Sequence, residues 1–154
     1  MTACVPRNLT GTYPNPNHDI ETEYTFDELW ARCMDYFAIN GLQVFTADKS
    51  GGVIVSSNIS FINNYTREVN GRPLNSDAYV AIPTIRGLRR AAVSGNLVMK
   101  GDLCVRVRDS RGRRIVIVNI NNLECSYYTG SHAMRIPIKS TGVLEQELLE
   151  YLSR

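Results

Sequence analysis

Cys125 and His132 come closest, among the residues of this chain, to a pair that could perform covalent catalysis. A histidine beside a cysteine can accept the thiol proton and leave a nucleophilic thiolate. Such a pair also needs an orienting acid, and the surrounding sequence offers none in a recognisable position. We therefore expect no catalytic residues and no enzyme activity.

The cysteines do not have the spacing of a metal site. Zinc ligands are commonly Cys-x-x-Cys pairs combined with histidines, whereas this chain has isolated cysteines and two histidines. We expect no metal and no cofactor, and a buried free thiol at Cys33. Cys104 and Cys125 are also expected to be free, although an oxidising compartment would allow them to form a disulfide.

Arginine and tyrosine side chains that suit binding occur in three stretches of the chain. Both residue types are enriched at protein interfaces. The predicted contact surface consists of Tyr65, Arg67, Arg86, Arg89, Arg90, Tyr127 and Tyr128. Other interpretations stay open. Residues 63–77 are also typical of a solvated connecting loop. The arginines around Gly87 also suit contact with a phosphate or a lipid headgroup, and they are more typical of a solvated loop or short helix.

Arginines also gather at the tip of a predicted hairpin, where Arg111, Arg113 and Arg114 lie close together. A site for single-stranded nucleic acid needs aromatic side chains among the arginines, on which bases stack. None lies between Arg106 and Arg114, and the formal net charge of +2 does not by itself indicate a nucleic acid or an acidic partner. We therefore do not expect nucleic-acid binding. No apolar run approaches the roughly 20 residues that a membrane helix needs.

A helix predicted from Thr25 to Asn40 organises the rest of the chain. Thr25 and Glu28 match a capping box, in which each side chain accepts a hydrogen bond from the backbone N–H of the other residue. Gly41 can adopt the left-handed conformation that ends a helix. The apolar residues recur at helical spacing and form one stripe: Phe26, Leu29, Trp30, Cys33, Met34, Phe37 and Ala38. This stripe must lie on a sheet or on another helix.

Strand patterns follow this helix and continue through the second half of the chain. Residues 42–45 and 53–61 flank a glycine-rich turn and predict an antiparallel hairpin. Residues 96–108 and 115–120 predict a second hairpin. Further strands are expected at 79–82 and 123–129, and a final helix at 143–153. The order predicts an α+β fold, an antiparallel sheet of about five to six strands with the two helices packed on one face.

The chain resembles a group of uncharacterised lipoproteins of Gram-negative bacteria of the gut Bacteroides kind, over Tyr24–Trp30, Phe37, Gly41-Leu42 and Asp48–Ile54. Their unit, a helix followed by a D-K-x-x-G-x-I hairpin, is similar to the helix-grip domains of BamC/NlpB-type outer-membrane assembly lipoproteins. The sequence departs from this pattern at Gly51-Gly52, where a single glycine is usual. The resemblance implies a helix-grip-like fold and a periplasm-facing position at the outer membrane, and it assigns no catalytic residues.

The first four residues have the small-small-cysteine ending of a bacterial lipoprotein cleavage site, so Cys4 is the predicted lipidation site. The charged and apolar parts of a signal peptide are missing from the sequence, and Cys4 is an ordinary cysteine if Met1 is the natural start. We expect residues 1–22 to be a turn-rich leader, either a tether or an edge segment on the sheet. Residues 23–154 are expected to form a single α+β domain.

These patterns lead to two hypotheses about function. The first is a non-enzymatic, outer-membrane-anchored lipoprotein domain that binds a protein or another cell-envelope component. The second is a small-molecule or lipid-binding carrier, or a weak hydrolase, whose pocket lies between the first helix and the sheet and is lined by Tyr24, Trp30 and Phe37. The other interpretation of these three side chains is that they fill the core.

Overall fold

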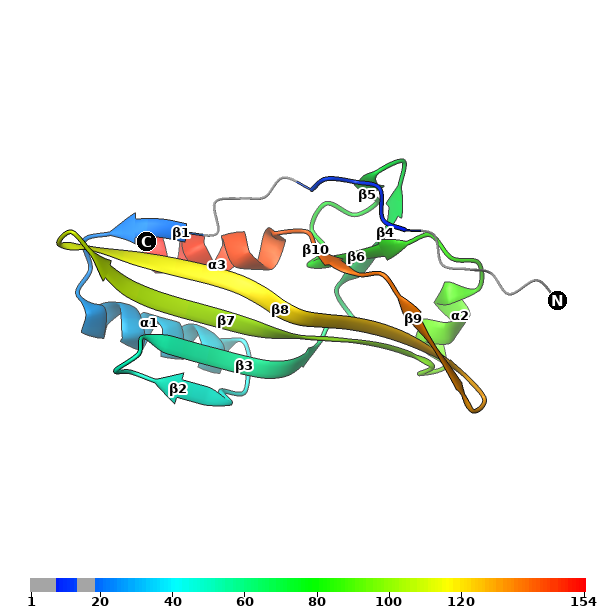
Figure 1. Ribbon diagram of the computed structural model, residues 1–154, viewed down its shortest axis with the longest axis horizontal. Coiled ribbons are helices and arrows are strands. Elements are labelled where there is room, and N and C mark those ends of the chain that lie inside the picture. Colours follow the sequence, from blue (N-terminus) through cyan, green and yellow to red (C-terminus); the bar gives the residue numbers. More distant parts are fainter. Residues whose placement is uncertain (1–7, 14–18) are drawn as a thin grey trace. The chain divides into compact units, whose positions relative to one another are not determined.

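The computed structural model describes residues 8–13 and 19–154, and the predicted lipidation site Cys4 lies outside them. In this part of the chain the fold is α+β, with helices packed on an antiparallel sheet (Figure 1). The helices are α1 (Phe26–Ile39), α2 (Leu88–Val93) and α3 (Val143–Ser153). The predicted fold class is confirmed, and the predicted bounds of α3 agree with the structure.

The strands of the described residues form two sheets. The larger sheet has the order β1-β8-β7-β3-β2, and β9 also pairs with β8. Its strands are β1 (Asp19–Thr22), β2 (Thr46–Asp48), β3 (Val53–Ser60), β7 (Leu97–Ser110), β8 (Arg113–Thr129) and β9 (His132–Ile136). The smaller sheet has the order β10-β6-β4-β5, with strands β4 (Tyr65–Val69), β5 (Arg72–Pro73), β6 (Val80–Pro83) and β10 (Lys139–Ser140).

The described residues divide into two compact units. Unit 1 contains residues 8–13, 60–101 and 122–143, and unit 2 contains residues 19–59, 102–121 and 144–154. The small sheet and α2 belong to unit 1, whereas α1 and nearly all of α3 belong to unit 2. The long strands β7 and β8 contribute residues to both units.

The helix α1 begins and ends as the sequence predicts. Thr25 Oγ1 accepts a hydrogen bond from Glu28 N (3.2 Å), and the Glu28 carboxylate accepts one from Thr25 N (2.7 Å). This reciprocal pair supplies acceptors for two backbone N–H groups that have no partner within the first turn of the helix. At the other end Gly41 has a φ of 65°, the left-handed conformation in which glycine carries no steric penalty.

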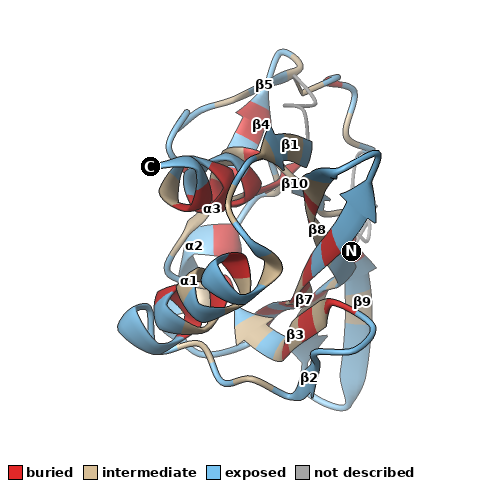
Figure 2. Ribbon diagram, turned by 90° about the vertical axis from the view of Figure 1, so that its left-hand side faces the viewer, coloured by how far each residue is buried: buried red, intermediate tan, exposed pale blue. Residues whose placement is uncertain are grey.

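The apolar stripe of α1 packs on the sheet within unit 2, except at Ala38, which is exposed. Leu29, Cys33 and Phe37 are inaccessible to water, and burial raises the pKa of the Cys33 thiol to about 12. Trp30 is half-buried and stacks on Phe26, with 5.9 Å between the ring centroids. Figure 2 shows α1 and α3 on the same side of β3, β7 and β8, as predicted.

Arg32 of α1 connects this helix to the end of α3. Its guanidinium Nη2 donates hydrogen bonds to the backbone oxygens of Tyr151 (2.8 Å) and Arg154 (2.7 Å). The same guanidinium lies over the rings of Tyr24 and Tyr151, at 5.0 and 5.6 Å from their centroids. The last carbonyl groups of a helix have no hydrogen-bond donors within it. The guanidinium of Arg32 donates to them and joins the two helices into one layer.

Two strand boundaries differ from the predicted ones. The strand expected at 42–45 is instead β2, and Phe45 N reaches Val55 O (2.8 Å) just before it. The turn pairs Asp48 directly with Val53, so the polar residues next to the turn form the strand although they lack an apolar pattern. The strands expected at 115–120 and 123–129 are one strand, β8, which continues through Asn122 although this residue has a φ of 52°, a left-handed conformation that asparagine tolerates.

The stretch 63–77, for which we predicted a loop, contains β4 and β5. Its buried positions are Thr66 and Glu68, whose polar side chains carry no apolar alternation that would mark a strand. The sequence likewise predicts no strand after residue 129, where β9 begins at His132 and pairs back on β8. Both errors have the same source, since strands held by hydrogen bonds need no hydrophobic period.

Two parts of the expected leader have defined positions. β1 lies at one edge of the larger sheet and pairs antiparallel with β8, with Ile20 opposite Val116. This agrees with the alternative of an edge segment for that part of the leader. Residues 8–13 belong to unit 1, where they contact β4. The division into a leader over residues 1–22 and one domain over residues 23–154 stays a prediction.

The three cysteines in the described part of the chain, Cys33, Cys104 and Cys125, are free thiols. The buried free thiol predicted at Cys33 is confirmed, and Cys104 and Cys125 do not form the alternative disulfide. Among helices α1 to α3, none is both long and apolar enough to cross a membrane.

Phe37 and Phe45 provide a matched test of this arrangement, because one is completely buried and the other is 78% exposed. We expect Phe37→Ala to lower the free energy of unfolding by about 3–5 kcal/mol, since it leaves a cavity under α1. Phe45→Ala should change it by less than about 0.5 kcal/mol. Urea denaturation followed by circular dichroism measures both, and equal effects of the two substitutions would contradict the described core.

Candidate functional site

The small sheet of unit 1 gathers residues from two separate stretches of the chain. β4 pairs parallel with β6, from Tyr65 opposite Val80 to Glu68 opposite Pro83. The residues that follow two parallel strands leave the sheet at the same end of those strands. The end of β4 and the segment from Thr84 onwards are therefore close together.

Hydrogen bonds to β4 fix the neighbouring segments of the backbone. Leu74 N donates to Arg67 O (2.8 Å), which folds the chain after β5 back along β4. Thr84 Oγ1 donates to Glu68 O (2.8 Å), which ties the segment after β6 to the same strand. Along β4 the side chains of Thr66 and Glu68 are buried, whereas Arg67 is exposed. The alternation of the strand thus presents Arg67 to solvent beside the segment that contains the other arginines.

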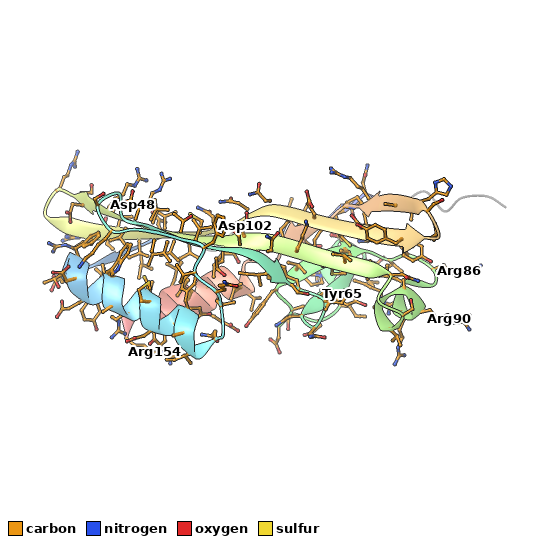
Figure 3. All side chains as sticks on the ribbon, turned by 90° about the horizontal axis from the view of Figure 1, so that it is seen from below. Asp48, Tyr65, Arg86, Arg90, Asp102 and Arg154 are labelled. Atoms are coloured by element: carbon orange, nitrogen blue, oxygen red, sulfur yellow. The ribbon has the colours of Figure 1, made fainter. Side chains whose placement is uncertain are left out.

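A cleft of about 1000 Å³ lies beside β4 in unit 1. Its walls come from β4, from the residue that follows β5, and from the segment that leads into α2. Figure 3 labels Tyr65 of β4, Arg86 of the turn before α2, and Arg90 of α2. The lining residues are Tyr65, Thr66, Arg67, Leu74, Thr84, Ile85, Arg86, Gly87, Leu88, Arg89 and Arg90.

Four arginines give this arginine cleft a positive charge. The guanidinium groups of Arg67, Arg86, Arg89 and Arg90 are exposed, and none makes a hydrogen bond or an ion pair to any residue that the structure describes. No acidic residue lines the cleft in the described chain. A concave surface of one sign attracts ligands of the opposite sign, so this cleft can bind anions.

Five of the seven predicted contact residues line the arginine cleft: Tyr65, Arg67, Arg86, Arg89 and Arg90. Tyr127 and Tyr128 do not line it, and as neighbours on β8 they point to opposite faces of the sheet. The sequence interpretation missed Leu74 and Thr84, which belong to the site only because of the fold. The polar composition of 63–77 concealed the strand that positions them.

The Cys125–His132 pair is not assembled in the structure. Cys125 lies opposite Ile136 and His132 opposite Thr129, so four positions of β8 separate them, about 13 Å along the strand. Cys125 is buried, and burial raises the pKa of its thiol to about 12, far from a reactive thiolate. Within residues 8–13 and 19–154 no three His, Cys, Asp or Glu side chains are grouped to hold a metal ion.

A second cleft of about 330 Å³ lies between β8 and the chain around β9 in unit 1. It is lined by Leu123, Glu124, Cys125, Ser126, Arg135, Ile136, Pro137 and Ile138. Its one cation, Arg135, and its small volume give it fewer groups for recognition than the arginine cleft offers.

On the opposite face of β4, Glu68 holds the segment 8–13. Its carboxylate accepts hydrogen bonds from Thr10 N (2.7 Å), from Gly11 N (3.1 Å) and from the hydroxyl of Tyr13. Burial acts to raise the pKa of Glu68, but these hydrogen bonds outweigh it and hold the pKa below its usual value of 4.5. Burial and the same carboxylate raise the pKa of Tyr13. Glu68 is therefore ionised at neutral pH and fastens the segment.

Further contacts complete the attachment of this segment. Lys139 Nζ donates to Gly11 O (2.9 Å) and lies 5.7 Å from the centroid of the Tyr13 ring. A Cβ atom at Gly11 would collide with the carbonyl oxygen of Gly71, so the close approach of these two segments of the chain requires glycine at position 11. The segment is thus built into unit 1 by charge, hydrogen bonding and backbone contact together.

Neither a scan against models of known protein families nor a search among curated proteins finds a match for this chain. The resemblance to envelope lipoproteins and the function that it implies therefore stay predictions.

The carboxylate of Glu68 makes stability depend on pH. Because its folded pKa is lowered, its contribution is complete above the unfolded pKa and is lost as pH falls through the folded pKa. We expect Glu68→Gln to cost about 1.5–3 kcal/mol of unfolding free energy near neutral pH, with a smaller cost at about pH 3. Urea denaturation at both pH values measures the difference from the wild type.

Asp35→Asn is the matched control, since Asp35 is an exposed carboxylate on α1. It should change stability little at either pH. A cost of Glu68→Gln that does not shrink in acid would contradict a role for the ionised carboxylate.

Proposed function

We propose that this protein is a non-enzymatic binding domain whose contact surface is the arginine cleft, and that its partner is an anionic protein or cell-envelope component. The observation that carries the proposal is the set of four guanidinium groups that line one cleft and have no partner among the described residues. Arginine recognises carboxylate and phosphate through paired hydrogen bonds, so an anion supplies what the cleft lacks.

The neighbouring side chains support binding of a large partner. Tyrosine, arginine and exposed apolar residues are the types that interfaces concentrate, and the cleft combines Tyr65 and Leu74 with its arginines. A site for covalent or acid–base chemistry would need aligned nucleophiles, acids and bases, and the lining contains no histidine, cysteine or carboxylate among the described residues.

The carrier hypothesis receives no comparable support. The three residues that would line its pocket already have contacts within unit 2: Phe37 is completely buried, and Trp30 stacks on Phe26. The Tyr24 hydroxyl donates a hydrogen bond to Arg154 O (2.6 Å). These contacts favour the interpretation that the three side chains stabilise the helix layer.

We further propose, from the resemblance of the sequence, that the natural gene product is a periplasm-facing lipoprotein held at the outer membrane by a lipid on Cys4. This places the arginine cleft where it meets other envelope components.

The binding proposal is tested with a panel of polyanions: poly-glutamate, polyphosphate, and vesicles that contain an anionic phospholipid. At low salt we expect at least one of them to bind the wild type, and Arg86→Gln/Arg90→Gln to weaken that binding by about tenfold. The control variant Arg106→Gln/Arg108→Gln removes the same charge from exposed positions of β7 and should bind like the wild type. Absence of binding, or equal losses in both variants, would show that the cleft is not the contact surface.

The location is tested by expressing the gene with its natural upstream sequence in cells fed with labelled palmitate. We expect the product to carry the label and to partition into detergent, and Cys4→Ser to abolish both properties. A soluble, unlabelled product would remove the lipoprotein proposal and leave the binding proposal unaffected.

A further inference from the structure

The composition of the arginine cleft points to one class of partner, and this inference rests on the proposed function. We infer that the cleft binds an acidic segment of a partner protein, in which carboxylate side chains flank one apolar side chain. The carboxylates pair with the arginines, and the apolar side chain packs against Leu74 and Tyr65.

The charges of the cleft are spread over two stretches of the chain. Arg67 belongs to β4, whereas Arg86 lies in the turn before α2, and Arg90 lies on α2 itself. They line a cleft of about 1000 Å³, which is at the upper end of the range for small-molecule sites. This distribution matches a ligand that carries several separated negative charges, and a single compact anion would leave most of the guanidinium groups unpaired.

The cleft also contains an apolar part that a purely ionic ligand would leave in water. Leu74 is 60% exposed, although its backbone N–H is fixed on Arg67 O at 2.8 Å. Tyr65 and Ile85 line the same cleft and are half-buried. An apolar side chain held at a fixed position and surrounded by arginines matches the arrangement of a protein interface, in which a polar rim encloses an apolar centre.

The same lining disfavours two other anionic partners. Tyr65 is the one aromatic side chain that lines the cleft in the described residues, whereas single-stranded nucleic acids are bound by several stacking aromatics. A membrane surface is contacted by apolar side chains that insert into it. Here Tyr65 and Ile85 are half-buried in the wall of a concave site, and Leu74 is the one exposed apolar side chain among the described lining residues. A peptide segment can lie along the cleft and contact both the arginines and the apolar side chains that line it.

The segment is expected to bind through its side chains and not as an additional strand. β5 forms one edge of the small sheet, is two residues long, and contains Pro73. Proline has no backbone N–H, and short edge strands with proline resist the pairing of a further strand. Specificity therefore depends on the arginines and on Leu74.

We test the inference with two fluorescent peptides that are rich in aspartate, one with a central leucine and one with serine in its place. The wild type should bind the leucine peptide about tenfold more tightly than the serine peptide. Leu74→Ser should remove that preference, whereas Val93→Ser, at an exposed apolar position of α2 outside the cleft, should keep it. Arg86→Gln/Arg90→Gln should weaken both peptides, and Arg106→Gln/Arg108→Gln should weaken neither.

Inorganic pyrophosphate and anionic vesicles are the comparison ligands. If either binds with the same dependence on Arg86 and Arg90 while the peptides do not bind, the peptide inference is wrong and the proposed function stands. If the leucine peptide binds but Leu74→Ser leaves its affinity unchanged, the apolar contact is wrong and the inference is overturned. If no anion binds the wild type, both the inference and the proposed function are overturned. Circular dichroism of each variant confirms that it is folded.

Discussion

The parallel pairing of β4 with β6 is the constraint on which the candidate binding surface depends. Because the two strands lie side by side, the segment that follows β6 passes next to β4, and Arg67 lines one cleft with Arg86 and Arg90. Like charges repel one another, so these arginines would separate in a flexible loop. The hydrogen bonds from Leu74 and Thr84 to the backbone of β4 hold them in place. The sheet thus maintains a concentration of positive charge that attracts anions.

The strand β4 serves two purposes because its side chains alternate between two faces. Arg67 is exposed and lines the cleft, whereas its neighbour Glu68 is buried and accepts hydrogen bonds from the segment 8–13. The buried carboxylate is acceptable because several donors satisfy its lone pairs. Burial of polar groups in place of apolar ones is unusual for a strand. In β4 this arrangement keeps the guanidinium of Arg67 and the carboxylate of Glu68 on opposite faces of the strand.

The sequence predicted those parts of the fold that have a strong hydrophobic period. The stripe that includes Leu29 and Phe37 identified α1, the capping box identified its first residue, and the alternation around Val105 identified β7. Prediction failed where hydrogen bonds replace apolar burial, as in β4, or where one asparagine continues a strand, as at Asn122. In the candidate site the arginines and Tyr65 were recognised by residue type, but Tyr127 and Tyr128 were grouped with them only because they are of the same type.

The sequence by itself determined the α+β class, the helix that packs on the sheet and the supply of arginines, because these follow from local spacing and composition. Only the tertiary structure decided which of the predicted contact residues share one surface. That choice rests on the pairing of β4 with β6, a contact between distant segments whose register no local pattern encodes. The same pairing made Leu74 and Thr84 part of the site, since each is placed by a hydrogen bond to a strand that the sequence did not reveal.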